Sequence, residues 1–288
     1  MSESRPFKMT ISLDVLRHLG IGLYSNVPAV LSELVANAWD ADATEVEITL
    51  DQDSPSITVQ DNGHGMSQRA VNEKFLTVGY RRRVTDSETP RGRPAMGRKG
   101  IGKLAAFSIA DTVEVHTADG RIASAFRMGT EGIKVAASDP SKPDYFPDPL
   151  DPEVDPSSPG TLIRLTKLRK RLAWAGPHLR RRLARRFSVI GPSGDFQVAV
   201  NGTAITVADR DYFKDMEFIW HFGQQANDWD FTMAPSGDNA GTVPAEVTIE
   251  PEGAGALIVH KVRGFIGTVK KPGNLDDVNN SIVLSARG

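Results

Sequence analysis

The segment Glu33-Leu-Val-Ala-Asn37-Ala-Trp-Asp40-Ala41 is followed along the chain by Asp61-Asn-Gly63-His-Gly65 and then by Gly97-Arg-Lys-Gly100-Ile-Gly102-Lys103. Each of these motifs is weak by itself, because polar residues four apart on a helix often face solvent and glycine pairs often mark turns. Their order and spacing make a chance combination improbable. Together they predict a pocket for ATP.

The first motif lies on a predicted helix that begins after Ser25 and Asn26, two residues suited to capping a helix. Glu33 and Asn37 are four residues apart and therefore share one helix face, which Asp40 extends. A carboxylate beside a carboxamide can orient a water against a phosphate while the amide oxygen binds Mg²⁺. A polar helix face in solvent is the alternative. The apolar residues at helical spacing, which should face a core, are Val30, Leu31, Leu34, Val35 and Ala38.

The second motif ends the later of two predicted strands, residues 44–50 and 57–61. Period-two alternation puts Asp61 at the end of an apolar row, where it should be sheltered from water. An ionised carboxylate there favours a base that presents an amine, as adenine does, over one that presents a carbonyl. Gly63 and Gly65 allow close approach of the backbone to a base. A simple strand-to-loop turn is the alternative for this motif.

The third motif opens a predicted helix from Ile101 to about Ala110. Backbone N–H groups at a helix N-terminus bind phosphate well, and Lys103 adds a positive charge. A flexible loop is the alternative. The segment 75–96 before it is polar and rich in Arg, Thr, Gly and Pro, which is typical of a lid that orders over bound nucleotide.

These motifs resemble those of the GHKL superfamily, which includes the gyrase B subunit, the large cytosolic heat-shock chaperone, histidine kinases and MutL. The strand that opens with Gly160-Thr161 resembles the fourth family motif, and its alternation points Thr161 inward. The resemblance implies an α+β fold of Bergerat type, a two-layer sandwich of a mixed, largely antiparallel sheet with helices on one face. Residues 23–28 and Met66 most resemble the MORC group and its bacterial MutL/MORC-like relatives.

The resemblance also implies the roles of individual residues. Glu33 would be the general base for the attacking water, and Asn37 would be the Mg²⁺ ligand. Asp61 would accept from the adenine amine, and Thr161 would support it. The full set of predicted ATP contacts is Asn37, Asp40, Asp61, Gly63, Gly65, Met66, Gly97, Lys99, Gly100, Ile101, Gly102, Lys103 and Thr161.

Two domains are predicted, an ATP-binding domain over 1–190 and a partial transducer-like (ribosomal S5 domain 2-like) α/β domain over 191–288. In the relatives, a transducer lysine reaches the terminal phosphate. Lys270 and Lys271 are candidates, although an exposed loop pair is the simpler interpretation. By the position of the family's lysine, we expect it to follow Gly288, which would make this chain an amino-terminal fragment.

Composition sets further limits. The 288 residues include no cysteine, which excludes disulfides and thiolate metal sites. No signal sequence or membrane-spanning run is present, which predicts a cytoplasmic protein without membrane contact. The net charge is −2, yet residues 164–186 contain ten Lys or Arg and no acidic residue, and residues 81–83 are all Arg. These basic segments predict DNA contacts; a solvated helix face or contact with the acidic loop 148–155 is the alternative.

The sequence therefore predicts Mg²⁺-dependent binding and slow hydrolysis of ATP. Bound ATP would order the lid around residues 81–102 and favour pairing of two copies into a homodimeric clamp on DNA. Two alternatives remain open. The chain could be a nucleotide-binding switch without significant hydrolysis, or a chaperone-like clamp on protein clients.

Overall fold

A computed structural model describes residues 7–10, 26–77, 88–97, 102–138, 144–169, 176–187, 189–190, 195–210, 212, 215–222, 239–243, 246–249, 258–261, 264–271 and 273. The chain divides into two compact units, one reaching from Met1 to Ile205 and the other from Thr206 to Ala286. No helix within the described ranges is long and apolar enough to cross a membrane.

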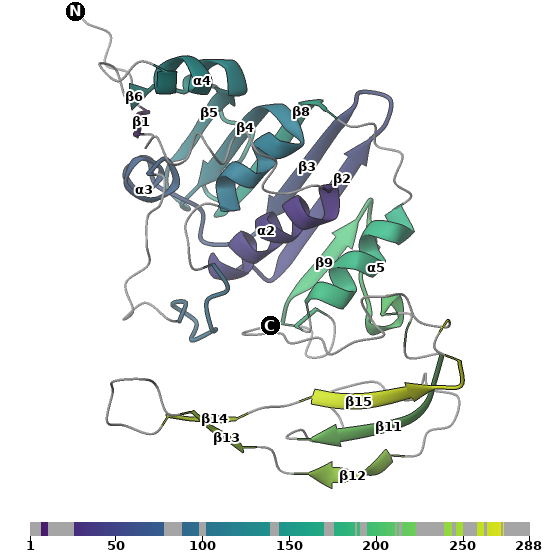
Figure 1. The fold of residues 1–288 in the computed structure, drawn as a ribbon. Coiled ribbons are helices and arrows are strands. Elements are labelled where there is room, and N and C mark those ends of the chain that lie inside the picture. Colours follow the sequence, from purple (N-terminus) through teal and green to yellow (C-terminus); the bar gives the residue numbers. More distant parts are fainter. Residues whose placement is uncertain are drawn as a thin grey trace, which may run out of the picture. The chain divides into compact units, whose positions relative to one another are not determined.

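The first unit is built on an eight-stranded sheet with the order β10-β9-β2-β3-β8-β4-β5-β7 (Figure 1). Every neighbouring pair in it is antiparallel except β2 and β9, which are parallel. The sheet is therefore mixed and largely antiparallel, as predicted. Its strands are β2 (Glu45–Asp51), β3 (Ser56–Asp61), β4 (Ala110–Ala118), β5 (Ala123–Gly129), β7 (Asp148–Leu150), β8 (Gly160–Leu168), β9 (Gln197–Val200) and β10 (Thr203–Ala204).

Helices cover one face of this sheet. The central one is α2 (Val27–Asp40), which packs against the 3-10 helix η2 (Gly102–Ser108) and against α5 (Gly176–Arg186) (Figure 1). The confirmed fold class is thus an α+β sandwich of Bergerat type. The smaller elements are β1 (Met9–Thr10), α3 (Gln68–Ala70), the π-helix η1 (Val71–Phe75), α4 (Thr130–Ser138) and β6 (Asp144–Tyr145).

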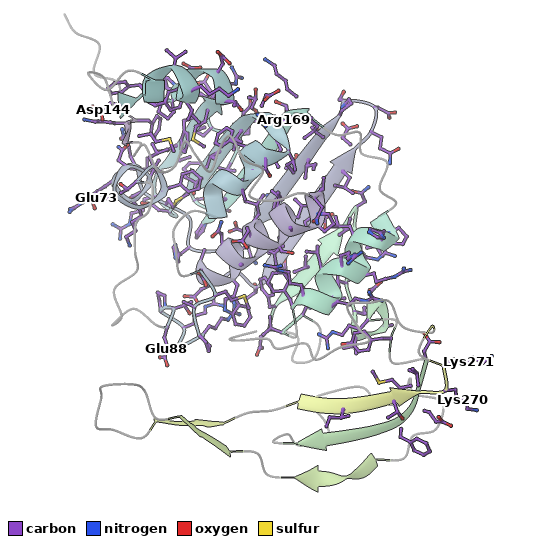
Figure 2. All side chains as sticks on the ribbon, in the orientation of Figure 1. Glu73, Glu88, Asp144, Arg169, Lys270 and Lys271 are labelled. Atoms are coloured by element: carbon purple, nitrogen blue, oxygen red, sulfur yellow. The ribbon has the colours of Figure 1, made fainter. Side chains whose placement is uncertain are left out.

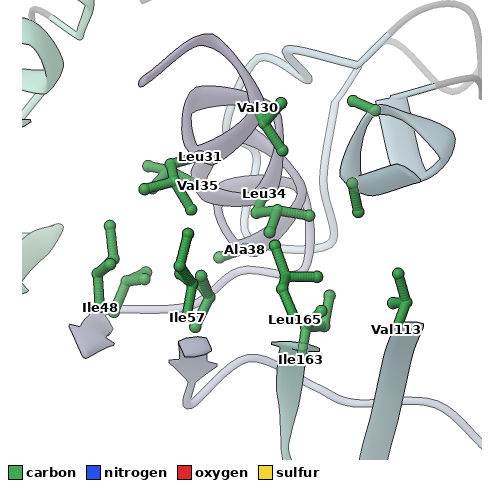
Figure 3. Close-up of a cluster of buried hydrophobic side chains, with 14 of the residues drawn as sticks. Val30, Leu31, Leu34, Val35, Ala38, Ile48, Ile57, Val113, Ile163 and Leu165 are labelled. Atoms are coloured by element: carbon green, nitrogen blue, oxygen red, sulfur yellow. The ribbon is translucent and has the colours of Figure 1, made fainter. Parts of the chain in front are cut away.

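Helix α2 starts and packs as its sequence predicts. The Asn26 side chain caps it by accepting a hydrogen bond of 2.9 Å from the Ala29 N–H group. Its buried face meets the inward residues of the sheet, and Figure 3 shows Leu31 and Leu34 facing the row that holds Ile57 and Leu165. Truncating such a buried leucine to alanine costs about 2–5 kcal/mol. This packing fixes the height and orientation of the polar residues on the rest of α2.

The first unit extends beyond the predicted domain boundary at residue 190. The strand β9 was expected to begin the second domain, but it pairs with β2. The Asn201 side chain reinforces the pairing, because it accepts from the Leu50 N–H group at 2.7 Å and donates to the Leu50 carbonyl at 3.3 Å. The physical reason for the difference is that the alternating pattern of residues 196–200 indicates a strand without indicating which strand it pairs with.

The second unit contains two small sheets. One has the order β12-β11-β15, with β11 (Met216–Phe222), β12 (Asn239–Val243) and β15 (Gly264–Val269); the other pairs β13 (Glu246–Ile249) with β14 (Ile258–Lys261). The short helix η3 (Val207–Asp209) begins the unit. Lys270 and Lys271 are exposed just after β15 (Figure 2). The expected strand at 281–286 lies outside the described residues, and the likeness to a transducer domain stays a prediction.

Candidate nucleotide-binding site

The carboxylate of Asp61 lies at the end of β3, a central strand of the sheet. Its Oδ1 atom accepts a hydrogen bond of 2.9 Å from the Gly63 N–H group. Burial raises the pKa of Asp61 to about 6, although hydrogen bonds from the Gly63 and Thr161 backbones and the nearby His64 oppose the rise. Asp61 is therefore a sheltered acceptor that is mostly ionised at pH 7.

Two threonine hydroxyls lie beside Asp61 in register across the sheet. Asp61 is opposite Thr161 in β8, and Thr161 is opposite Thr117 in β4. The Thr117 hydroxyl donates to the Gly160 carbonyl at 3.1 Å, accepts from the Met66 N–H group at 3.0 Å, and lies 3.1 Å from the Thr161 hydroxyl. Since its single proton is used on Gly160, Thr161 is the donor between the two threonines.

Sequence reasoning identified Thr161 but missed Thr117. The signal available was a threonine near the end of the segment that forms β4, and many solvent-facing threonines have the same local pattern. Only the register of β4 on β8 shows that this side chain is buried beside the site.

Gly63 and Gly65 are required by the fold around the site. Gly65 has a φ of +60°, and a Cβ there would lie 1.7 Å from the Ala118 carbonyl oxygen. A Cβ on Gly63 would lie 2.7 Å from the Ala41 carbonyl oxygen. The backbone of this loop is thus pressed against the end of β4 and the end of α2. Contact of these glycines with an adenine base stays a prediction.

Glu33 and Asn37 share a face of α2, one turn apart. The Asn37 side chain is exposed, whereas Glu33 is partly buried. The Glu33 Oε1 atom lies 3.4 Å from Nη2 of Arg186 on α5. This ion pair joins α2 to α5, and its two residues are 153 positions apart in the sequence.

Asp40 holds the backbone at the start of the third motif. It is buried, and its Oδ1 and Oδ2 atoms accept from the N–H groups of Met96 at 2.7 Å and Gly97 at 2.9 Å. A Cβ on Gly97 would lie 2.8 Å from the Asp40 Oδ2 atom. Both carboxylate oxygens therefore accept hydrogen bonds from the protein backbone. The described contacts give Asp40 the role of fixing the glycine motif to α2; contact with ATP stays a prediction.

A further set of contacts fixes residues 88–97, which we call the lid anchor, to the C-terminal end of α2. The Thr89 hydroxyl donates to Asp42, the residue that follows the helix cap. The guanidinium of Arg93 stacks over the Trp39 ring at 4.5 Å from its centroid. Sequence reasoning assigned this stretch to a mobile lid and did not anticipate these contacts.

Several predicted site residues lie outside the described residues. These are Lys99, Gly100, Ile101 and the basic segment 81–83. Gly102 begins η2, whose side chains are described only from Ala105 onward, which leaves out Lys103.

The second basic segment, residues 164–186, is only partly directed to solvent. Arg164 pairs with Glu153 at 2.6 Å and with Glu114 at 3.3 Å. This bears out, for Arg164, the alternative of contact with the acidic loop. The predicted helix is present as α5, where Arg181 and Arg182 are exposed.

These features together define a Bergerat-type ATP-binding domain. They are the mixed sheet with helices on one face, the sheltered aspartate at the end of a central strand, and the Glu–Asn pair on the covering helix. Residues 24–161 match the family described as histidine kinase-, DNA gyrase B-, and HSP90-like ATPases. This region of the chain belongs to this family, which confirms the resemblance to the GHKL superfamily. The narrower likeness to MORC or MutL proteins stays a prediction.

Two kinds of relatives differ in how much of the chain they cover. The putative type II restriction enzyme HgiDII of Herpetosiphon aurantiacus is 36% identical over 290 residues, covering 100% of this chain and 45% of that protein. The chaperone protein HtpG of Francisella tularensis subsp. novicida is 33% identical over 141 residues, covering 41% of this chain and 22% of that protein. HtpG of Nitrobacter hamburgensis is 27% identical over 46% of this chain and 25% of that protein. The chain thus spans less than half the length of these curated relatives.

Proposed function

We propose that this chain binds ATP with Mg²⁺ and hydrolyses it slowly, and that bound ATP orders the lid and pairs two copies into a clamp on DNA. The observation that carries the proposal is the row of Asp61, Thr161 and Thr117 across three adjacent strands, in which the two threonines are buried and Asp61 is partly buried. A row of one acid and two hydroxyls at the end of an otherwise apolar sheet face suits the polar edge of a purine.

The Asp61 carboxylate supports a preference for adenine. An ionised carboxylate has only acceptor atoms, so it pairs with the exocyclic amine of adenine and repels the carbonyl that guanine presents at the same position. Leaving a buried acceptor opposed to a carbonyl is costly, which makes such discrimination strong.

Glu33 and Asn37 are proposed to carry the chemistry on the phosphate side. Glu33 would take a proton from the attacking water, and its partly buried carboxylate suits that role. No cluster of three His, Asp or Glu residues able to hold a metal occurs among the described residues. The exposed Asn37 amide oxygen fits an ion that keeps most of its ligands as water and phosphate. Mg²⁺ bound there would neutralise charge on the phosphates.

Asp40 and Asp42 hold residues 88–97, the lid anchor, to the end of α2. The rest of the lid is proposed to order over bound ATP. Pairing of two copies is proposed to depend on that ordering.

DNA is the proposed client because one relative that matches the full length of this chain is named a putative type II restriction enzyme. The exposed Arg181 and Arg182 on α5 suit contact with phosphates. The HtpG relatives, which cover less than half of the chain, favour the second candidate, a chaperone-like clamp on protein clients.

The test compares Mg²⁺-dependent ATP turnover by the wild-type chain, Glu33→Ala and Asp61→Asn, together with binding of a non-hydrolysable ATP analogue. We expect Glu33→Ala to bind the analogue normally without turnover, and Asp61→Asn to bind it weakly. Turnover by Glu33→Ala at the wild-type rate would refute the assigned base. Analogue binding without turnover in the wild type would favour the switch without hydrolysis.

The client is tested by DNA binding in the presence of the analogue at increasing salt. We expect binding that weakens steeply with salt and that the double variant Arg181→Ala, Arg182→Ala reduces. Suppressed aggregation of an unfolded protein without DNA binding would instead support the chaperone-like clamp.

A further inference from the structure

Helix α5 brings one arginine to the carboxylate of Glu33. The helix buries Leu179, Leu183 and Ala184, and it packs against both α2 and β9 (Figure 1). This packing places Arg186, its last residue, where Nη2 lies 3.4 Å from Oε1 of Glu33. Arg186 thus belongs to a different helix from Glu33, and the packing of α5 against α2 and β9 determines its position.

The two oxygens of the Glu33 carboxylate differ in their surroundings. Oε1 meets the guanidinium of Arg186, and among the described residues this is the only hydrogen-bond or ion-pair partner of the side chain. Oε2 is therefore open to accept a proton. The pair is partly exposed, with 26% of the Glu33 and 52% of the Arg186 side chain accessible, so it contributes little to stability.

The rate of a reaction that uses a general base increases when the flexible side chain of that base is held in the reactive orientation. We propose that Arg186 is a positioning residue for Glu33, which holds Oε1 and directs Oε2 toward the attacking water. The inference rests on the proposed ATP hydrolysis. In that step the water oxygen bonds to the terminal phosphorus, the bond from phosphorus to the bridging oxygen breaks, and ADP leaves with the electron pair. The proton of the water passes to Oε2.

The first experiment measures kcat and KM for ATP in the full chain with Mg²⁺. Arg186→Ala should lower kcat by about tenfold to a hundredfold, as expected for a misplaced catalytic group, with KM changed less than about twofold. Arg186→Lys should recover part of kcat because it keeps the charge at a similar reach. A kcat of Arg186→Ala equal to or above the wild-type value would overturn the proposal.

The matched control is Arg127→Ala, which removes an arginine paired with Glu114 at 2.8 Å on the sheet. It makes the same change of charge away from Glu33 and should leave kcat unchanged. A loss as large as that of Arg186→Ala would mean that any broken Arg–Glu pair lowers turnover, which would also overturn the proposal.

Glu33→Ala separates this proposal from the proposed function. Wild-type turnover in that variant means that Glu33 is not the base, whatever Arg186 does. Lost turnover in Glu33→Ala together with normal turnover in Arg186→Ala means that the base is correct and the positioning role is wrong.

Discussion

Lowering the pH from 7 to 5 should weaken the binding of an adenine nucleoside, because it protonates Asp61. Burial raises the pKa of this carboxyl to about 6. With that pKa, the ionised fraction falls from about nine-tenths at pH 7 to about one-tenth at pH 5. If the ionised form alone accepts from the adenine amine, the apparent Kd rises about tenfold, which corresponds to about 1.4 kcal/mol.

The same carboxyl should affect folding with the opposite sign. Because its pKa is raised in the folded chain, its contribution to stability is fully present below the unfolded value near 3.8 and is lost as the pH rises through about 6. Between these values, rising pH therefore strengthens nucleoside binding while it lowers stability. A general acid-induced unfolding cannot produce that combination.

The assay is calorimetric titration with adenosine at constant ionic strength, since adenosine has no phosphate and does not titrate between pH 5 and 7. Asp61→Asn should bind weakly at both pH values. His64 lies three residues after Asp61 and is close enough to influence its carboxyl, so His64→Gln is the control that should keep the pH dependence. The reasoning fails if wild-type affinity is constant from pH 7 to 5, or if Asp61→Asn keeps the tenfold change.

Three other predictions concern the surroundings of the site. Thr117→Val should lower the free energy of unfolding by about 1–3 kcal/mol, because it removes three hydrogen-bonding contacts, whereas Thr117→Ser should be near wild type; equal denaturation curves for both would contradict this. Gly65→Ala should abolish binding of the ATP analogue, because its Cβ would meet Ala118, while Gly92→Ala, at φ +76° in open space, should retain binding; analogue binding by Gly65→Ala would count against the packing argument. Asp40→Asn should speed amide hydrogen exchange in residues 96–97, because an amide nitrogen would face a backbone N–H group; unchanged exchange would show that the anchor does not need the acid.

The sequence was sufficient to predict the elements that carry local patterns. Helix α2 has a capping residue and helical apolar spacing, and β3 has a clean period of two, so each was predicted close to its observed bounds. The mixed sheet and its helical layer followed from the resemblance to a known family.

Contacts between distant segments could not be predicted from local patterns. The pairing of β9 with β2 depends on register and packing, and an alternating strand carries no mark of its partner. For the same reason Thr117, Arg186 and the stacking of Arg93 on Trp39 were missed. Asp40 was predicted as an ATP contact, which stays a prediction, and its spacing on α2 could not show that both of its oxygens accept from residues 96–97.

Synthesis of β9 comes long after that of β2, since 151 residues separate Leu50 from its partner Asn201. At a typical ribosomal rate the outer edge of β2 waits roughly 8–30 s for that partner. An open strand edge is a template for pairing with other chains. Expression of a piece that stops at residue 190 should therefore favour aggregation, whereas a piece that reaches Ala204 covers the outer edge of β2 with β9.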